Sequence, residues 1–387
     1  MNNFNFHVST EILFGKGRIN ELPKVLKKYG KNVLLVYGGK SIKVNKIYNK
    51  INELLTSFNI YELSGVEPNP RIESVRDGVK ICKENKIDVI LAVGGGSVID
   101  CAKVTACGAF YNGDAWDIVK QTFKPEKAIP IVTVLTLAAT GSEMNSSAVI
   151  TNFETNEKLG VTIPITLPKT SILDPTYLFT LPAIQTAAGT ADIMSHIFEV
   201  YFNNSKTAFV TDRFCESLLK TCIKYLPIAL KEPDNYEARS NLMWAGSLAI
   251  NGLCACGKFD ESWSCHPIEH QLSAYYDITH GTGLAILTPH WMRYILSEKT
   301  VDKFDEYAKN VWNLPENKDK MFLANQAIDL TEQFFKKCGI PMTLSELGID
   351  DSKFEIMAQK AVKARNLQNA YIPLKEDDII QIFKNSL

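Results

Sequence analysis

The sequence predicts a chain of two parts, an α/β N-terminal domain with a parallel sheet and an all-α C-terminal domain. The first half alternates short β-branched runs with helical segments, which is typical of parallel strands joined by crossover helices. After Leu181-Pro182 the strand pattern stops and helical periodicity takes over. A chain of 387 residues is also long for a single hydrophobic core. We therefore expect domains at residues 1–182 and 183–387.

Each element is predicted from its local pattern. The strands are expected at Asn32–Tyr37, Ile60–Leu63, Asp88–Val93 and Ile129–Leu135, with shorter ones at Ala148–Thr151 and Thr170–Leu173 completing the first domain. Between the strands, Ile72–Asn85 has helical periodicity. The helices of the second half are expected at Ala183–Phe202, Phe209–Tyr225, Tyr236–Ile250, Ser262–Ala274, Gly283–Ser297 and Val301–Val311. Pro182 stands where the first turn of a helix tolerates proline.

The composition indicates an ordinary soluble globular protein. The hydrophobic content is 45%, the charged content 22% and the net charge −1, so no basic surface for nucleic acid is expected. No apolar run is long enough for a membrane span, and the N-terminus does not resemble a signal peptide. Nine cysteines without regular spacing fit reduced thiols. We therefore expect a cytoplasmic protein.

Five aspartate and histidine side chains form the main candidate site. Asp192 and His196 are four residues apart, as are His266 and His270, and His280 follows. Residues at this spacing share one face of a helix. Oxygen and nitrogen donors of this kind suit a divalent first-row metal with one position open for a substrate oxygen, and they leave Fe(II), Zn(II), Co(II) and Ni(II) as alternatives. The second domain is therefore predicted to bind a metal that acts as a Lewis acid.

Two loops of the first half are candidates for a dinucleotide site. GGGSVIDCAK (residues 94–103) follows a predicted strand and opens a helix, where glycine N–H groups and the helix dipole favour phosphate. It departs from the standard fingerprint at Ile99, so a plain strand-to-helix turn is the alternative. TLAATGSEMNSS (residues 136–147) could line a nicotinamide or ribose, or be a surface turn. Together the loops favour a Rossmann-like domain.

The end of the first predicted strand bears on the choice of cofactor. Sites for NAD usually place a carboxylate on the adenosine ribose, but here the strand runs into Gly39, Lys40 and Ser41, with Lys43 close behind. Lysine and serine side chains could hold a 2′-phosphate. This favours NADP(H), and a solvated turn is the alternative.

Four motifs, in order along the chain, resemble those of the iron-containing, or group III, alcohol dehydrogenases. They are GGGSVIDCAK, TLAATGSE, GTADIMSHIFEVYF and CHPIEHQLSAYYDITHG. Within this family the chain most resembles the NADPH-dependent butanol dehydrogenases. The resemblance implies a Rossmann-like domain, a helical domain, a metal and nicotinamide in the cleft between them, and a homodimer.

The resemblance also implies roles for individual residues. The metal ligands would be Asp192, His196, His266 and His280, and His270 would be an active-site histidine beside the metal. Contacts to the cofactor would come from Asn69 on the adenosine side, from Gly95, Gly96 and Ser97 at the pyrophosphate, and from Thr136, Leu137, Thr140, Ser142, Val149 and Lys158 at the nicotinamide and its ribose. The chain departs from the family pattern at Gly39, where NAD-preferring members carry aspartate, and at Leu137 and Ala139.

These observations predict reversible hydride transfer between NADP(H) and a primary alcohol or aldehyde such as butanol or butanal, with aldehyde reduction favoured and Fe(II) or Zn(II) as the metal. A metallohydrolase is the main alternative, since Asp/His clusters also activate water. A lyase like the dehydroquinate synthases would want several basic side chains near the metal, and Ser262 to Gly281 contains none. A non-catalytic metal-binding protein is the third alternative.

Overall fold

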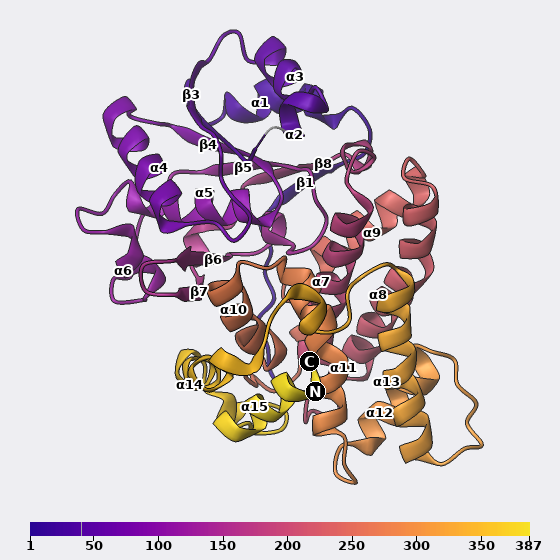
Figure 1. The fold of residues 1–387 in the computed structure, drawn as a ribbon. Helices are drawn as coiled ribbons and strands as arrows, with labels where there is room; N and C mark the ends of the chain where they lie inside the picture. Colours follow the sequence, from indigo (N-terminus) through magenta and orange to yellow (C-terminus); the bar gives the residue numbers. More distant parts are fainter. Residues whose placement is uncertain (40) are drawn as a thin grey trace. The chain divides into compact units, whose positions relative to one another are not determined.

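Six parallel strands form the main sheet of the N-terminal half, in the order β1-β8-β5-β4-β2-β3 (Figure 1). The strands are β1 (Glu11–Phe14), β2 (Asn32–Tyr37), β3 (Asn59–Leu63), β4 (Val89–Gly94), β5 (Ile131–Leu135) and β8 (Thr170–Leu173). The helices of this half are α1 (Leu22–Leu26), α2 (Ser41–Val44), α3 (Ile47–Leu54), α4 (Ile72–Asn85), α5 (Gly96–Gly108) and α6 (Ala115–Val119). The predicted α/β parallel-sheet class is confirmed.

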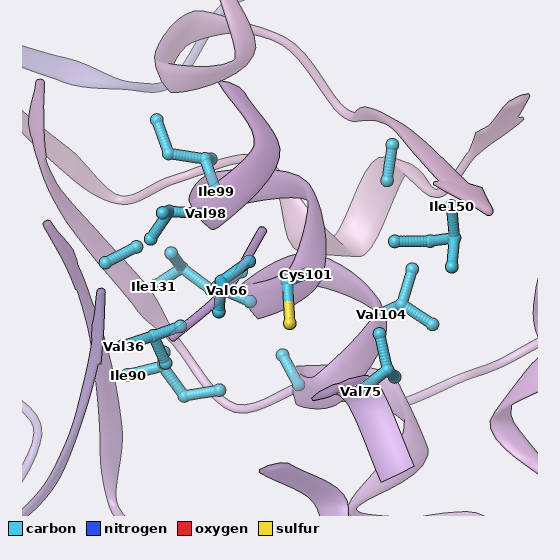
Figure 2. Packing of buried hydrophobic residues seen from close by; sticks show 14 of the residues in the cluster. Val36, Val66, Val75, Ile90, Val98, Ile99, Cys101, Val104, Ile131 and Ile150 are labelled. Carbon is cyan, nitrogen blue, oxygen red and sulfur yellow. The ribbon is translucent and has the colours of Figure 1, made fainter. Parts of the chain in front are cut away.

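The central strands are buried on both faces, which explains their continuous apolar runs. Along β2, Leu34 and Val36 pack on one side of the sheet, and Val33 and Leu35 on the other. Figure 2 shows the first of these two clusters, in which side chains of α5 such as Cys101 lie against the strands. Helix α5 is buried along nearly its whole length and is therefore held firmly on the sheet.

The structure corrects the assignment of the strand near residue 148. β6 (Ser147–Asn152) does not join the parallel sheet but pairs antiparallel with β7 (Glu157–Thr162) in a separate hairpin. The turn that reverses the chain contains Asn156 at a left-handed φ of 49°, and the side chain of Asn152 accepts a hydrogen bond from the backbone of Glu154. A tight turn of this kind joins antiparallel strands, whereas parallel strands need a long crossover.

The C-terminal half is helical, as predicted. Its helices are α7 (Ala183–Tyr201), α8 (Phe209–Lys231), α9 (Tyr236–Ala249), α10 (Cys265–Tyr276), α11 (His280–Ile295), α12 (Val301–Asn310), α13 (Lys320–Lys337), α14 (Phe354–Ala364) and α15 (Glu376–Asn385). Helix α8 continues past the predicted end at Tyr225 and includes Pro227. Helix α11 begins at His280, earlier than predicted, so this histidine lies in its first turn.

The computed structural model describes residues 1–39 and 41–387, and the role predicted for Lys40 lies outside the described residues. The chain forms two compact units, one of residues 7–181 and 233–247, the other of residues 1–6, 182–232 and 248–387. Most of α9 therefore belongs to the first unit. In the described chain, no helix is both long and apolar enough to cross a membrane.

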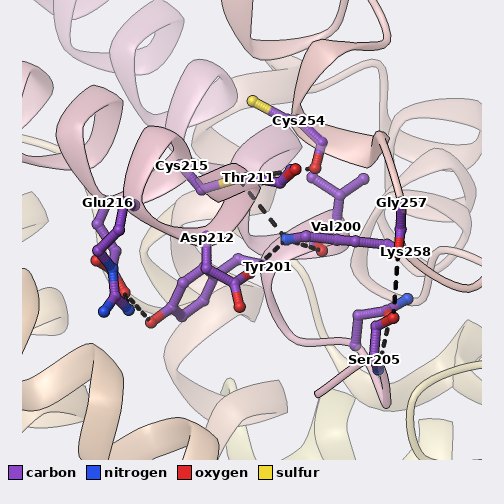
Figure 3. A network of polar contacts seen from close by, with 12 residues as sticks. Val200, Tyr201, Ser205, Thr211, Asp212, Cys215, Glu216, Cys254, Gly257 and Lys258 are labelled. Atoms are coloured by element: carbon purple, nitrogen blue, oxygen red, sulfur yellow. Dashed lines mark hydrogen bonds and ion pairs between the residues drawn. The ribbon is translucent and has the colours of Figure 1, made fainter. Parts of the chain in front are cut away.

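A buried ionic network fixes the C-terminal end of α7 (Figure 3). The ammonium of Lys258 donates to the backbone carbonyl of Val200 at 2.8 Å and pairs with Asp212 of α8 at 2.8 Å. Lys303 of α12 reaches the other oxygen of Asp212 at 2.7 Å. A lysine on the last carbonyls of a helix satisfies acceptors that the helix itself leaves unpaired. The network thereby anchors the helix that carries two of the predicted metal ligands.

Candidate functional site

The four predicted metal ligands converge on one point inside the helical unit. Asp192 and His196 come from α7, His266 from α10 and His280 from the start of α11. Oδ1 of Asp192 lies 3.5 Å from Nε2 of His196, 3.6 Å from Nε2 of His266 and 3.7 Å from Nε2 of His280. Ligand atoms bound at about 2.0–2.1 Å to a tetrahedral cation lie roughly 3.4 Å apart. The three distances from Asp192 are close to this spacing, and the donor atoms of Asp192, His196 and His266 all lie within 4.8 Å of one another, as a shared cation requires.

Burial and missing hydrogen bonds also point to a cation. Asp192 is 2% exposed, His196 5% and His266 4%. Within the described chain, Oδ1 of Asp192 and Nε2 of His266 have no hydrogen-bond partner. Buried polar atoms are costly to leave unpaired. A metal ion would satisfy both of these atoms, so the residues fit the group that the sequence predicted.

The electrostatics of the cluster favour an anionic Asp192. Burial opposes its ionisation, but the neighbouring histidines, His196 foremost, hold the pKa of this carboxyl below its usual range. Burial lowers the pKa of His196 to about 3, which keeps its imidazole neutral and able to donate a lone pair. Burial alone would lower the pKa of His266 as well, but the carboxylates of Asp192 and Glu199 raise it to about 9.

Two glutamates that the sequence analysis did not single out lie behind the histidines. Oε1 of Glu199 lies 3.0 Å from Nδ1 of His266 and accepts the backbone N–H of the same residue at 2.7 Å. Glu269 contacts Nδ1 of His280. Carboxylates in this position orient metal-binding histidines. Their spacing, three residues after a predicted ligand on the same helix, is a signal that could have found them.

His270 lies beside the four side chains. Its ring centre is 5.4 Å from that of His280 and 6.4 Å from that of His266, and its side chain is partly exposed. Since partial exposure allows proton exchange with solvent, His270 is suited to proton transfer at the edge of the cluster.

The backbones of α7 and α11 touch next to the cluster. A Cβ atom on Gly281 would lie 2.0 Å from the carbonyl oxygen of Ala188, so only glycine fits there. Gly281 directly follows His280, and Ala188 lies about one turn before Asp192. This contact helps to fix the separation between the side chains of His280 and Asp192.

In the other unit, the two predicted cofactor loops are in direct contact. β4 ends at Gly94, Gly95 caps α5, and α5 begins at Gly96. A Cβ atom on Gly96 would lie 2.2 Å from Oγ1 of Thr140, and one on Gly95 would lie 3.1 Å from Cβ of Leu137. The second loop, which folds over the start of α5, therefore requires Gly96 and packs tightly against Gly95.

A buried charge network joins these loops and was not predicted. The ammonium of Lys103 on α5 donates to Oγ of Ser142 at 2.7 Å and also reaches Asn145 and the carbonyl of Ser147. The carboxylate of Asp100 accepts the hydroxyl of Ser142 at 2.5 Å and the backbone N–H of Val149 at 2.9 Å. Burial lowers the pKa of Lys103 to about 8. Sequence spacing alone does not reveal such partners, because they come from a separate loop.

The structure also places the remaining predicted cofactor residues of this unit. Thr136 donates its backbone N–H to the carbonyl of Gly94 at 3.0 Å, which places it where β5 leaves the sheet beside β4. Ser97 lies partly exposed in the first turn of α5. Lys158 donates to Oδ1 of Asn69 at 2.8 Å, and Asn69 has a left-handed φ of 51°.

Gly39 and Ser41 follow β2, the strand next to β4. The strand order reverses between β2 and β4, and open α/β sheets bind ligands outside the carboxyl ends of the strands at such a point. Both predicted loops therefore border the expected nucleotide site of this unit.

The fold and the cluster of Asp192, His196, His266 and His280 are those expected of a metal-dependent oxidoreductase, and comparison with known proteins gives the family. The model of the iron-containing alcohol dehydrogenases matches residues 9–175, and that of the C-terminal domain of the Fe-containing alcohol dehydrogenase family matches residues 186–387. The chain belongs to the iron-containing (group III) alcohol dehydrogenase family.

Individual relatives cover nearly the whole chain. NADH-dependent butanol dehydrogenase A of Clostridium acetobutylicum is 55% identical over 100% of both chains. The NADPH-dependent aldehyde reductase YqhD of Escherichia coli is 40% identical over 93% of each. The crystal structure of NADH-dependent butanol dehydrogenase A of Thermotoga maritima superimposes with a TM-score of 0.95 at 39% identity, covering 100% of this chain and 99% of that one. These matches give no support to the hydrolase and lyase alternatives.

Proposed function

We propose that this enzyme transfers a hydride between NADP(H) and a short primary alcohol or aldehyde, such as butanol or butanal, and works mainly as an aldehyde reductase. The observation that carries the proposal is the convergence of three imidazole Nε2 atoms within 3.7 Å of one carboxylate oxygen of Asp192. Family membership supports the reaction class. The relatives named as butanol dehydrogenase and aldehyde reductase support the substrate class.

In this proposal Asp192, His196, His266 and His280 hold a divalent cation, Fe(II) or alternatively Zn(II). The cation supplies Lewis-acid polarisation of the substrate oxygen. Burial of Asp192, His196 and His266 strengthens the electrostatic interactions among them. We assign His270 to proton exchange with the substrate oxygen and to positioning of the substrate.

The cofactor is proposed to bind over the two loops and the end of β2. The backbone of Gly95, Gly96 and Ser97 would hold the pyrophosphate at the start of α5. Thr136, Leu137, Thr140, Ser142, Val149 and Lys158 are assigned to the nicotinamide and its ribose, and Asn69 to the adenosine side. The contact between the loops supports this assignment, because it makes one continuous surface of them.

The preference for NADP(H) rests on the residues after β2. Gly39 brings no carboxylate to repel a 2′-phosphate, and Lys40, Ser41 and the exposed Lys43 bring positive charge and a hydroxyl. The relatives do not agree on the cofactor, since one is named NADH-dependent and another NADPH-dependent. The cofactor ratio is therefore the deciding measurement.

We also propose a homodimer in the cytoplasm. The nine cysteines are buried and unpaired in the described chain, which fits a reducing compartment. The family resemblance implies the dimer, and light scattering of the purified protein would test it.

The function is tested by anaerobic oxidation of NADPH with butanal, using protein stripped of metal and reloaded with Fe(II) or Zn(II). We expect turnover that requires metal and is faster with NADPH than with NADH. Metal-dependent turnover that prefers NADH would keep the reaction class and overturn the cofactor preference. Loss of turnover with both cofactors and both metals would overturn the proposed function and favour hydrolase or lyase chemistry.

A further inference from the structure

The proposed metal site contains three histidines, His196, His266 and His280. In two of them, the ring nitrogen that faces away from Asp192 contacts the carboxylate of a glutamate. Glu199 lies behind His266, and Glu269 behind His280. Ionised carboxylates only accept hydrogen bonds, so Nδ1 of each histidine carries its proton. Nε2, on the side of Asp192, is then the ring nitrogen that a cation would bind in place of a proton.

The third histidine is held differently. Nδ1 of His196 is buried and has no hydrogen-bond partner among the described residues. Its ring instead stacks on that of His266, with centres 4.6 Å apart and planes 22° apart, and lies 5.7 Å from the ring of Trp263. The cluster is therefore asymmetric, with two ligands oriented by charge and one by packing.

Glu269 is fixed more tightly than an ordinary surface glutamate. It is 0% exposed, and its Oε1 accepts the hydroxyl of Ser273 at 2.5 Å. A Cβ atom on Gly283 would lie 2.8 Å from Cγ and Oε1 of Glu269, so the first turn of α11 closes over the carboxylate. The other oxygen, Oε2, contacts His280. This geometry leaves the carboxylate little freedom to turn away from the imidazole.

The two glutamates change the charge of the centre. With the four predicted ligands alone, a divalent cation would leave the site positive. Asp192, Glu199 and Glu269 together supply three buried carboxylates, which outnumber the two charges of the cation. A carboxylate that accepts a hydrogen bond from Nδ1 of a histidine makes Nε2 of that ring a stronger electron-pair donor to a metal. Stronger donors and a surplus of negative charge favour a bound cation, and they favour its higher oxidation state over its lower one.

We propose that Glu199 and Glu269 are metal-positioning residues that raise the affinity of the site and lower the Fe(III)/Fe(II) potential of bound iron. The proposal rests on the proposed function for the metal itself. It assigns the two glutamates no contact with substrate or cofactor. Its consequence is an iron centre that air oxidises more readily than its four ligands alone would suggest.

Glu269 allows the sharper test, because glutamine can keep its contacts with His280 and Ser273. In Glu269→Gln, the amide oxygen can accept from Nδ1 of His280 while the amide N–H₂ donates to the hydroxyl of Ser273. This variant removes charge and keeps geometry, whereas Glu269→Ala removes both. Ser273→Ala keeps the charge and removes one supporting hydrogen bond. Glu298→Gln, at an exposed position, controls for the loss of a surface charge.

The experiment measures two quantities that do not require turnover. The Kd for Zn(II) and Co(II) is measured by competition with a chromophoric chelator, and the iron potential by anaerobic redox titration. We expect Glu269→Gln to weaken metal binding about tenfold and to shift the potential upward, and Glu269→Ala to weaken binding about 10- to 100-fold. Ser273→Ala is expected to change binding less than either, and Glu298→Gln not at all. Circular dichroism of the metal-free variants checks that each is folded.

Two outcomes overturn the inference without touching the proposed function. One is that Glu269→Gln and Glu269→Ala are both folded and bind Zn(II) and Co(II) with Kd values within twofold of those of the parent protein. The other is an iron potential that Glu269→Gln leaves unchanged or lowers. By contrast, a parent protein that binds no metal would overturn the proposed function itself.

Discussion

The ammonium of Lys103 and the hydroxyl oxygen of Ser142 lie 2.7 Å apart, although one belongs to α5 and the other to the loop after β5. Asp100, on the same helix as Lys103, accepts the hydroxyl of Ser142. The helix that starts at the glycine loop therefore also positions the second predicted cofactor loop.

Replacing Lys103 by methionine should weaken cofactor binding and leave metal binding unchanged. The methionine fills a similar volume but donates nothing to Ser142, and hydrogen bonds from a charged group contribute about 1.5–3 kcal/mol. We expect the Kd for NADPH, measured by fluorescence titration, to rise at least about tenfold. Lys80→Met, at an exposed position on α4, serves as the matched control. An unchanged Kd in folded Lys103→Met would show that the network does not order the loop for binding.

The buried ammonium of Lys103 should also make stability depend on pH. Burial lowers its pKa from 10.5 to about 8, so between these pH values the unfolded chain binds a proton that the folded chain lacks. The contribution of Lys103 to the free energy of unfolding should therefore rise as the pH increases from 8 to 10.5, by up to about 3 kcal/mol. Denaturant unfolding of the parent and of Lys103→Met across this range gives the contribution by difference. A difference that stays flat with pH would contradict the lowered pKa.

Asp192→Asn should abolish tight metal binding. The substitution keeps the shape of the side chain and removes the negative charge around which the three Nε2 atoms gather. Because changes behind a ligand cost about 10- to 100-fold in affinity, the loss of a charged ligand should exceed 100-fold. Metal content after dialysis, measured by elemental analysis, checks this. Retention of one equivalent of metal would exclude Asp192 as a ligand.

Gly39→Asp should shift the cofactor preference toward NADH. A Cβ atom at Gly39 meets nothing within 4 Å, so the new side chain has room. Its carboxylate would repel a 2′-phosphate and could accept hydrogen bonds from ribose hydroxyls. The ratio of kcat/KM for NADPH over NADH should fall at least about tenfold, which corresponds to about 1.4 kcal/mol. Gly39→Asn, neutral and of the same size, should have a much smaller effect. An equal effect of both would point to sterics rather than charge.

Gly281→Ala should destabilise the helical unit and loosen metal binding together. The added methyl group would lie 2.0 Å from the carbonyl oxygen of Ala188 and must push α11 away from α7. Overpacking of this kind typically costs about 1–3 kcal/mol. Thermal unfolding and a metal titration of the same sample measure both effects. Gly39→Ala, where a methyl group has space, should be close to neutral.

The regular parts of the fold could be predicted because their patterns are local. Helix α4 has the predicted bounds Ile72–Asn85, and strands β2 and β8 match as well. β1 was not predicted, because four residues with only Leu13 buried give no clear pattern. The pairing of β6 with β7 depends on a turn whose key residue, Asn156, is an ordinary polar residue in sequence.

The predicted metal ligands could be found from the sequence, but the contacts of the side chains that support them could not. Helical spacing predicted that Asp192 and His196 share a helix face, and the family resemblance added His266 and His280 as ligands. The structure brings the donor atoms of all three histidines to Asp192. The supporting side chains were missed for a physical reason. The spacing of Glu199 after His196 makes it a candidate, but its contact with His266 of α10 depends on packing between two helices and cannot be read from the sequence.

The nine buried, unpaired cysteines leave this fold without a covalent cross-link in the described chain. Strong reductants can therefore be present throughout purification and titration without cutting any bond that the tertiary structure needs. In the proposed iron-bound enzyme, the potential of the buffer can then be varied to reduce or oxidise the metal. An experimenter can set the oxidation state of the metal and the folding state of the polypeptide as two independent variables, which disulfide-linked enzymes do not allow.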